Sequence, residues 1–476
     1  MFTSVVKERV TAIYFVALAA MMYYFMEQVI TIPYTIPVRQ LIVLLIIFSG
    51  VVIFLIHPNL ARASVALRSA LIFALPMLVM ITVSLPIWFV NRVTPLELYR
   101  ESWNYLIYMN QFLAALVSAV FLYLFGKRGI WYNLAGLLAA NLGWILSLMV
   151  EEGVGPYLRE LYRLVVTFAG ETGDIIARAE VHELAFCLGV YIVYMLLFYR
   201  KDFVFNCLLI LSLFCFVSAF KRIAMGSIVI SLAAGFALKL LGRKGNDKAV
   251  KYTIRITFIL VCILLLFYIA FVKADGFHLL EKLGLDTMSR ADIYDMVDEY
   301  YRFSPAFWGH GMGWLSYQLT RVIELWENAI HNDYLQFYID LGFWGYLFWI
   351  ISLTFVRTGY YGRKGRIWDR INTFVIMCYI LILSTTDNTM NYQMLYTVSG
   401  IVIMGHTFDR QVQEEDRRLL GFIEEPNLIM TDEDMTERWR EGRSERRRRK
   451  EEKKKRKEKA GRVANGKKGE RDCAGI

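Results

Sequence analysis

The fold of this chain is constrained above all by a succession of long apolar runs. A helix needs about 20 apolar residues to cross the hydrocarbon core of a bilayer. Twelve runs approach that length, near residues 10–30, 38–56, 65–90, 105–125, 130–150, 181–199, 203–220, 222–241, 254–273, 334–356, 371–386 and 390–408. The sequence therefore predicts an all-α, polytopic membrane protein with about twelve transmembrane helices.

Composition agrees with this prediction. The 476 residues are 57% hydrophobic and only 20% charged, which excludes an ordinary water-soluble globule. The first run is longer than a signal-peptide core and lacks a cleavage site, so we expect a retained anchor. Five of the six cysteines lie within apolar runs, and no disulfide or zinc spacing emerges.

Orientation follows from the basic residues of the short connections, because these favour the cytoplasmic side. With the N-terminus in the cytoplasm, nearly all of them fall inside: Lys7, Arg9, Arg62, Arg68, Lys127, Arg128, Arg200, Lys201 and the loops "GRKGNDKAVK" and "RTGYYGRKGRIWDR". We therefore expect a multi-pass protein of the cytoplasmic (inner) membrane with both termini in the cytoplasm.

Two long connections, 151–180 and 274–333, fall on the outer side in this topology. The second, between predicted helices nine and ten, is rich in Trp and Tyr, and we expect it to be structured. Its stretch "SRADIYDMVDEYYRF" carries apolar residues at helical spacing, namely Ile293, Met296, Val297, Tyr300 and Tyr301. This pattern predicts a packed extracytoplasmic helix.

Ser289 and Asp292 have the spacing of a capping box, which makes Arg290 the first residue of that helix. Free N–H groups at a helix start, together with a guanidinium fork, suit the oxygens of a phosphate. The alternative is an Arg that pairs with a nearby acid of this acid-rich loop.

Lys221 and Arg222 stand between two apolar runs with hardly any loop, on the predicted outer side. Ionisable groups so close to the hydrocarbon are candidates for function. The alternative is that both side chains extend to the lipid headgroups.

His331 and Asn332 begin the apolar helix of "ENAIHNDYLQFYIDLGFWGYLFW". Histidine titrates with an ordinary pKa of about 6.5, so a neutral imidazole can take a proton from a sugar hydroxyl. The alternative is a capping or interfacial His. His310 and His331 lack the i, i+4 spacing of a helical metal site, and no Cys joins them, so we expect no metal.

These stretches resemble a known family. "HNDYLQFYIDLGFWG" is similar to the H-N-x-x-L-x-x-x-x-E-x-G-x-x-G signature of the bacterial O-antigen ligase and O-antigen polymerase family, with Asp340 in place of Glu. "SRADIYDMVDEYYRFSPAFWGHGMG" resembles the segment that precedes it there. "SAFKRIAMG" is similar to the family's Ser-Arg helix start, with Lys221 where Ser is common. "ARAEVHELAFCLGVY" resembles a further segment, in which His182-Glu183 replaces Pro-Asn.

The resemblance, which covers about residues 160 to 408, implies a membrane glycosyltransferase at the outer face of the cytoplasmic membrane. Such enzymes transfer or polymerise glycan from an undecaprenyl-diphosphate carrier to a glycan or lipid acceptor during synthesis of O-antigen or capsule-like polysaccharide. They use no nucleotide sugar, cofactor or metal. Polymerases and ligases share the motifs, so the resemblance leaves both open.

In this reading Arg222 and Arg290 grip the diphosphate, and His331 is the general base or donates to the leaving phosphate. Asn332 orients His331 or caps its helix. Asp387, in the turn "TTDNTMNY", resembles an acid near the family's site; the alternative is a solvated turn residue.

The remaining candidates for substrate binding are of second rank. Gly311 and Gly313, with Gly309, would let the backbone approach phosphate or sugar. Arg178 precedes the predicted sixth helix, 181–199, and His182 lies at its start.

Residues 409–476 differ from the predicted transmembrane bundle of residues 1–408. They begin acidic and end in "RSERRRRKEEKKKRKEK", with few apolar residues and no core. We expect a charged cytoplasmic tail, largely disordered or helical, that lies near anionic membrane lipids. No aromatic residues interleave with the basic run to support nucleic-acid binding.

A second class of function is a transporter or flippase of lipid-linked glycan, for which twelve helices are an ordinary layout. Transporters place charged groups near the midplane and show two related halves. No such repeat is visible here, and the unusual cations gather at one face. This favours the enzyme.

Overall fold

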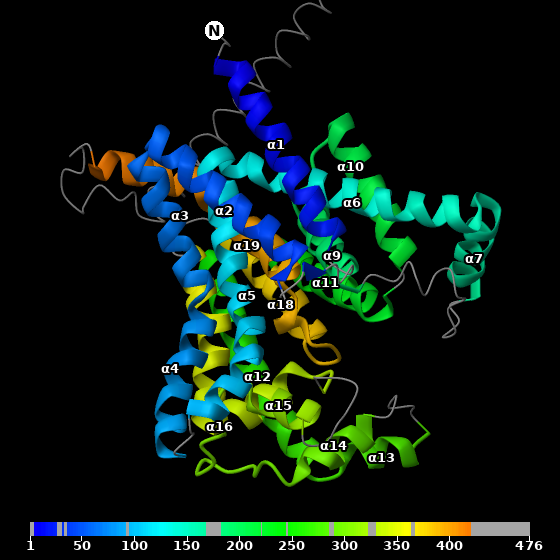
Figure 1. Ribbon diagram of the computed structural model, residues 1–476, viewed down its shortest axis with the longest axis vertical. Coiled ribbons are helices and arrows are strands. Elements are labelled where there is room, and N and C mark those ends of the chain that lie inside the picture. Colours follow the sequence, from blue (N-terminus) through cyan, green and yellow to red (C-terminus); the bar gives the residue numbers. More distant parts are fainter. Residues whose placement is uncertain are drawn as a thin grey trace, which may run out of the picture. The chain divides into compact units, whose positions relative to one another are not determined.

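A computed structural model of the chain describes residues 4–25, 31–32, 36–91, 95–167, 182–219, 221–243, 246–284, 290–321, 330–362 and 367–419. The chain divides into two units, Met1–Asp416 and Arg417–Ile476. The first unit is almost wholly helical and carries every candidate site residue (Figure 1). Two antiparallel strands of two residues each, β1 (Thr31–Ile32) and β2 (Ile36–Pro37), pair beside the start of the second helix.

The first half of this unit contains nine helical elements. They are α1 (Ser4–Tyr24), α2 (Val38–Ile56), α3 (Leu60–Phe73), α4 (Leu75–Val90), α5 (Pro95–Phe125), the 3₁₀ turn η1 (Gly126–Arg128), α6 (Gly129–Glu152), α7 (Val154–Thr167) and α9 (His182–Leu197) among the described residues.

The second half alternates long helices with short ones. Its elements are α10 (Phe203–Ala219), α11 (Arg222–Arg243), α12 (Asp247–Lys273), α13 (Gly276–Lys282), α14 (Arg290–Asp298), α15 (Trp314–Arg321), α16 (Asp333–Ile351), the π-helical segment η2 (Ser352–Val356), α17 (Arg357–Tyr361), α18 (Ile367–Leu383), the 3₁₀ turn η3 (Thr389–Asn391) and α19 (Gln393–Leu419).

Helices cover most of each apolar run among the described residues, and the run 65–90 is divided between α3 and α4. The all-α fold is confirmed, whereas the number of twelve transmembrane helices is not. Fewer helices have both the length and the hydropathy of a membrane span. Among the described residues these are Val38–Ile56, Met109–Glu152, Arg222–Arg243, Asp247–Lys273 and Asp333–Tyr361, five in all, or six with the bent pair α3 and α4. The segment Met109–Glu152 contains two of the predicted runs, whereas α9 and α10 are apolar but shorter than a span.

The bend between α3 and α4 divides one apolar run into two helices at an angle of 53°. Pro76 lies in the first turn of α4, where its missing N–H cannot continue the ladder of α3. The carbonyl of Phe73 instead accepts a hydrogen bond from the guanidinium of Arg357, which also lies 4.1 Å above the Phe73 ring. The buried guanidinium of Arg357 thus supplies a hydrogen-bond donor to a carbonyl at the C-terminal end of α3.

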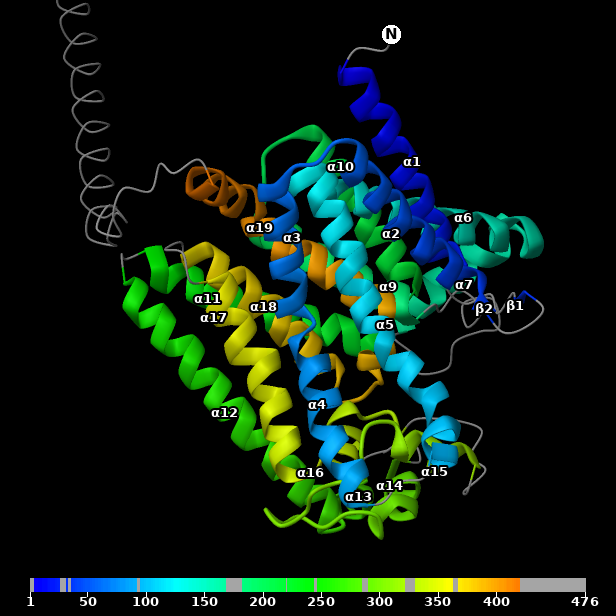
Figure 2. The same ribbon diagram turned by 60° about the vertical axis from the view of Figure 1, so that its left-hand side comes forward.

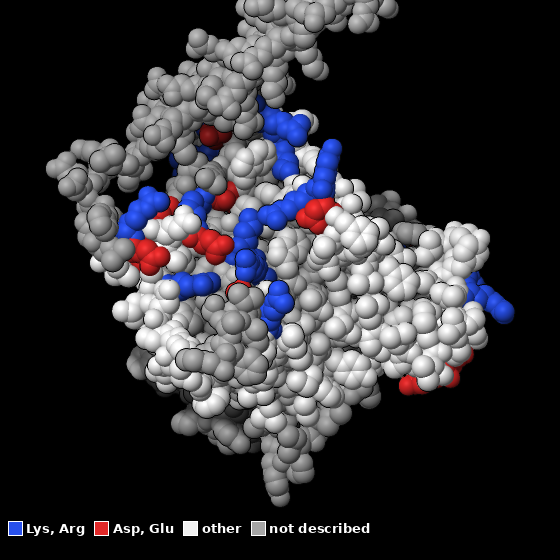
Figure 3. All heavy atoms as spheres, turned by 90° about the horizontal axis from the view of Figure 1, so that it is seen from above, with Lys and Arg blue, Asp and Glu red and all other residues white. Residues whose placement is uncertain are grey.

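One end of the first unit collects the Lys and Arg residues of the short connections, and we call it the basic end (Figure 3). Contacts there join segments far apart in sequence. Arg128 pairs with Glu8 at 2.7 Å, and the Lys127 N–H donates to Asp409 at 3.1 Å. Arg68 pairs with Glu415 at 3.0 Å. These contacts bring the start of α1, the connection between α5 and α6, α3 and the second half of α19 to one end of the unit.

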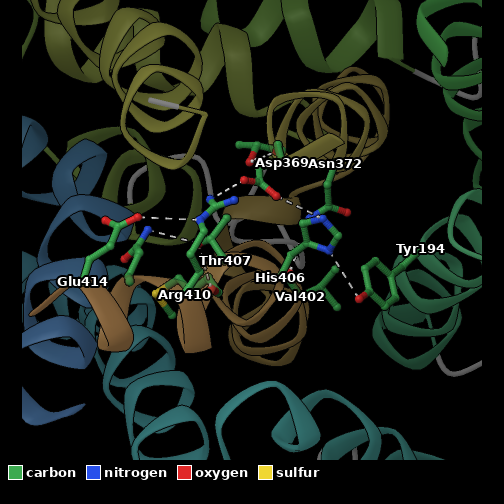
Figure 4. Close-up of polar contacts among 11 residues, drawn as sticks. Tyr194, Asp369, Asn372, Val402, His406, Thr407, Arg410 and Glu414 are labelled. Atoms are coloured by element: carbon green, nitrogen blue, oxygen red, sulfur yellow. Dashed lines mark hydrogen bonds and ion pairs between the residues drawn. The ribbon is translucent and has the colours of Figure 1, made fainter. Parts of the chain in front are cut away.

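A polar network joins α18 and α19 near the basic end (Figure 4). The Asp369 carboxylate accepts from Arg410, and its other oxygen lies 3.4 Å from Nε2 of His406. The opposite ring nitrogen of His406 is 3.4 Å from the Tyr194 hydroxyl on α9, while Glu414 lies 3.9 Å from Nε of Arg410. These contacts fix the relative register of α18 and α19.

The opposite end of the first unit, which we call the site end, carries α13, α14 and α15 between α12 and α16 (Figures 1 and 2). The predicted packed helix is α14, and it begins at Arg290 as expected. Its buried face was predicted wrongly in part: Ala291, Tyr294 and Val297 are buried, whereas Met296 is 43% exposed. Tyr294 packs edge-on against Phe277 of α13, and this contact, rather than the strongest apolar pattern, sets the rotation of α14.

Candidate functional site

The turn that follows α18, residues 384–388, brings the candidate site together. Arg290, the first residue of α14, donates from Nη2 to the Thr386 carbonyl at 3.1 Å. That contact joins residues 96 positions apart in the chain. One donor of the guanidinium fork is thereby fixed on the turn.

His331 reaches the same turn from α16. Its Nδ1 lies 3.5 Å from Nδ2 of Asn388. His331 also has a φ of +51°, a left-handed conformation that a residue with a Cβ rarely adopts. Such backbone strain gathers at functional sites and persists where the surroundings hold it in place.

Asn332 holds the chain beside His331 in position. Its Oδ1 caps α16 by accepting the N–H groups of Tyr334 at 3.1 Å and Leu335 at 3.2 Å. Its Nδ2 donates to the hydroxyl of Tyr294 at 3.0 Å and to that of Tyr268. Burial raises the pKa of Tyr294, so this hydroxyl stays protonated. Asn332 thus links α12, α14 and α16.

Asp387 is buried within the turn, only 8% exposed, and is therefore not the solvated turn residue of the alternative reading. Its Oδ1 accepts from the Tyr392 hydroxyl at 2.6 Å and from the Asn388 N–H at 2.8 Å. The Asp387 carboxylate thus lies one residue before Asn388, whose side-chain amide faces His331.

Asp333 is a site residue that the sequence analysis missed. Its buried Oδ2 accepts from the Thr389 hydroxyl at 2.8 Å and from the Met390 N–H at 3.1 Å. Its own N–H faces the Ser384 carbonyl at 3.3 Å. Asp333 therefore fastens the turn to the start of α16. The signal available in the sequence was a third polar residue after His331 and Asn332, immediately before an apolar helix.

Asp340, which replaces the usual Glu of the signature, is fully buried and organises the Gly-rich loop. Its two carboxylate oxygens accept the N–H groups of Gly313 at 2.9 Å and Leu315 at 3.0 Å, which caps α15. The Asp340 carbonyl accepts the N–H of Gly311 at 2.7 Å. The N–H groups of Gly311 and Gly313 are therefore used within the protein, and a role for them toward substrate stays a prediction.

The glycines of this loop are explained by close packing. Gly309 and Gly342 both have positive φ, at +81° and +69°, and lie backbone to backbone. A Cβ on Gly309 would come within 2.4 Å of the Gly342 nitrogen, and one on Gly311 would collide with the Trp88 ring. The loop can thus approach α16 and α4 only without side chains at these positions.

Arg222 lies at the site end without joining the cluster directly. Gly242 packs against Ile367 and Gly235 against Val375, so α11 and α18 run antiparallel. The exposed Arg222, first residue of α11, therefore lies toward the end of α18 that leads into the 384–388 turn. Within the described ranges no hydrogen bond or ion pair connects it to Arg290 or His331.

His310 has a structural setting distinct from the site. Its Nε2 donates to the Tyr300 carbonyl at 2.8 Å, and its ring stacks on Trp314 at 3.9 Å. Burial lowers the pKa of His310, so the ring is neutral in the folded loop. It therefore holds the chain between α14 and α15.

Three predicted positions lie outside the described residues or side chains. Arg178 and Ser289 fall in undescribed segments. His182 opens α9, but its side chain is not described.

The described residues thus bring Arg290, His331, Asn332 and Asp387 to one turn. A guanidinium, an imidazole and a carboxylate arranged around a backbone turn can hold an anion and move a proton.

No protein of the curated set matches this chain. Residues 207–350 match the family whose description is O-antigen ligase. The matched segment runs from α10 to α16 and includes Arg222, Arg290, His331 and Asn332. Together with the motifs around these residues, this match supports the assignment of residues 207–350 to the O-antigen ligase family.

Proposed function

We propose that this membrane protein transfers or polymerises glycan from an undecaprenyl-diphosphate carrier to an acceptor hydroxyl at the outer face of the cytoplasmic membrane. The family assignment supports a membrane enzyme of polysaccharide synthesis. The observation that carries the finer proposal is the meeting of Arg290 and His331 at one turn, through Thr386 and Asn388.

The chemistry divides between these residues. As the bond from the anomeric carbon to the diphosphate oxygen breaks, its electron pair leaves on the diphosphate. Arg290 and Arg222 are the cations that bind the growing charge, without a metal ion. His331 takes the proton from the acceptor hydroxyl while the new glycosidic bond forms, or supplies a proton to the departing phosphate.

Asn332 and Asp387 are positioning residues in this scheme. Asn332 fixes the direction of the chain at His331 by capping α16. Asp387 orients Asn388, whose amide faces the imidazole. Arg178 and His182 are proposed as further contacts to the glycan.

The proposal includes the topology. We propose twelve membrane crossings with both termini in the cytoplasm, which sets the basic end inside and the site end outside. The charge pattern of the short connections supports this orientation, since the basic end gathers Lys and Arg (Figure 3).

The test is a variant series in cells whose own copy of the gene is deleted. Arg290→Ala and His331→Ala are expected to reduce glycan transfer by about 100-fold or more, and Arg222→Ala by about tenfold. Arg128→Ala, an exposed Arg at the basic end, is the matched control and keeps full activity. Glycan chain length, the amount of lipid-linked donor and the membrane level of each variant are measured together.

The same series separates the enzyme from a transporter. Loss of transfer leaves the lipid-linked glycan accessible to a membrane-impermeant reagent from outside, whereas loss of transport leaves it inaccessible. Unchanged glycan in all three variants at normal membrane level would overturn the proposal.

A further inference from the structure

A second polar cluster flanks the site turn on its other side. We call it the amide cluster and define it as Gln40 of α2, Asn110 and Gln111 of α5, and Gln393 of α19. Nε2 of Gln40 donates to Oδ1 of Asn110 at 2.9 Å and to Oε1 of Gln393 at 3.1 Å. Nε2 of Gln111 donates to the Met390 carbonyl at 2.7 Å.

Several polar atoms of this cluster are buried without a hydrogen-bond partner among the described residues. They are Oε1 of Gln40, Nε2 of Gln393 and Nε of the adjacent Arg39. Gln393 is only 1% exposed. Burying a polar group without a partner is costly, so these three unpartnered atoms call for a binding partner that the described residues do not supply.

The unpartnered atoms indicate the chemistry of the ligand. Oε1 of Gln40 is an acceptor, whereas Nε2 of Gln393 and Nε of Arg39 are donors. A hydroxyl group can bond to either kind of atom, because it both donates and accepts hydrogen bonds. The positive charge of Arg39 has a counter-charge nearby, because Arg39 interacts electrostatically with the buried carboxyl group of Glu183. A neutral sugar would leave this charge balance unchanged, whereas a phosphate would add a second anion beside Glu183.

The amide cluster and the site share one loop. The peptide groups of Met390 face both: its carbonyl accepts from Gln111, and its N–H donates to Asp333. Further along the loop, Tyr392 donates to Asp387. A ligand in the amide cluster would therefore lie across residues 384–393 from His331.

We infer that the amide cluster with Arg39 is a carbohydrate subsite, which binds the hydroxyl groups of a neutral sugar of the glycan substrate through Gln40 and Gln393. The inference rests on the proposed function for the identity of that glycan. It adds a subsite drawn from α2, α5 and α19, all outside the segment that matches the O-antigen ligase family.

The test uses the purified full-length protein in lipid nanodiscs and two probes. Methyl glycosides of glucose, galactose, N-acetylglucosamine and rhamnose are examined by saturation-transfer NMR, and inorganic pyrophosphate by ³¹P line broadening. Gln40→Met and Gln393→Met keep the side-chain size and remove the amide. Gln411→Met is the matched control, because Gln411 lies on α19 near the basic end and binds Thr407.

We expect at least one glycoside to give a signal that falls by about fivefold or more in Gln40→Met and Gln393→Met, a change of about 1 kcal/mol. Gln411→Met keeps the glycoside signal. Pyrophosphate broadening is unchanged in the Gln variants and lost in Arg290→Ala. Should both Met variants fail to fold, Asn110→Ala, at a half-buried position, tests the same cluster.

Two results would overturn the inference: no glycoside signal with the wild-type protein, or a signal that the folded cluster variants leave unchanged. Absence of pyrophosphate binding beside an intact glycoside signal would contradict the diphosphate part of the proposed function and leave the subsite standing. The two proposals therefore fail separately.

Discussion

Nδ2 of Asn332 donates a hydrogen bond to the Tyr294 hydroxyl at 3.0 Å. This contact ties the residue beside His331 to the helix that begins with Arg290. The two proposed catalytic side chains are therefore linked by one amide and one phenol, and the separation between α14 and α16 depends on that link.

Tyr294→Phe removes only the hydroxyl and tests this link. Asn332 retains its bond to Tyr268, so we expect the protein to fold with a loss of about 1 kcal/mol in the free energy of unfolding. We expect transfer activity to fall by about fivefold or more, because α14 can shift relative to His331. Glycan transfer and chemical unfolding are measured side by side.

Tyr300→Phe is the matched control, since its ring packs on Trp314 in the same region without contacting Asn332. Full activity of Tyr294→Phe would show that the spacing of α14 and α16 does not depend on this hydroxyl.

Asp333 and the turn provide a second prediction. The Asp333 side chain accepts from the Thr389 hydroxyl and the Met390 N–H at Oδ2, and the Ser384 side chain is a further hydrogen-bond partner of this carboxyl group. Asp333→Asn keeps one such oxygen and is expected to remain folded and active. Asp333→Ala leaves the Met390 N–H unsatisfied and leaves the Thr389 hydroxyl with Ser384 alone, and we expect a loss of about 1–3 kcal/mol in stability together with lower activity. Equal behaviour of the two variants, in unfolding titrations and transfer assays, would contradict this account.

Asp340 is expected to respond differently to the same substitution. Each of its two oxygens accepts a different N–H, from Gly313 and from Leu315. Asp340→Asn turns one acceptor into a donor that faces an N–H, so we expect a loss of about 2 kcal/mol even though the shape is kept. The pair Asp333→Asn and Asp340→Asn, compared by unfolding in the same detergent, checks the contrast. If Asp340→Asn were as stable as the wild-type protein, the two hydrogen bonds from Asp340 to the start of α15 would not be needed for stability.

Local features of the chain were predictable from the sequence. Apolar runs set the helices, because a run of about 20 apolar residues satisfies its backbone only as a helix in lipid. The helix expected from the "SRAD" stretch is present as α14, whose first described residue is Arg290, while the capping role of Ser289 stays a prediction. The residues of the "HND" and "SRAD" stretches were identified by type and by family resemblance.

Contacts between distant residues were not predictable. Asp333 binds Thr389 and Met390, 56 and 57 positions away, and Gln40 binds Gln393, 353 positions away. Nothing in the local pattern of either partner specifies the other. On the buried face of α14, Tyr294 replaces Met296, and packing between helices decides this. The bend at Ala74, by contrast, has a local cause, because Pro76 follows it in the sequence.

The last prediction concerns the pH dependence of the loop that contains His310. Burial holds the pKa of His310 below its ordinary value, so the folded state binds the proton less well than the unfolded state. The stabilisation is therefore fully present above the ordinary pKa of about 6.5 and is lost as the pH falls below it toward the folded value. His310→Gln keeps a donor for the Tyr300 carbonyl without titrating. We expect the thermal unfolding midpoint of the wild-type protein to fall between pH 7 and pH 5 by more than that of His310→Gln, measured by tryptophan fluorescence. Parallel pH profiles for the two proteins would contradict a buried neutral His310.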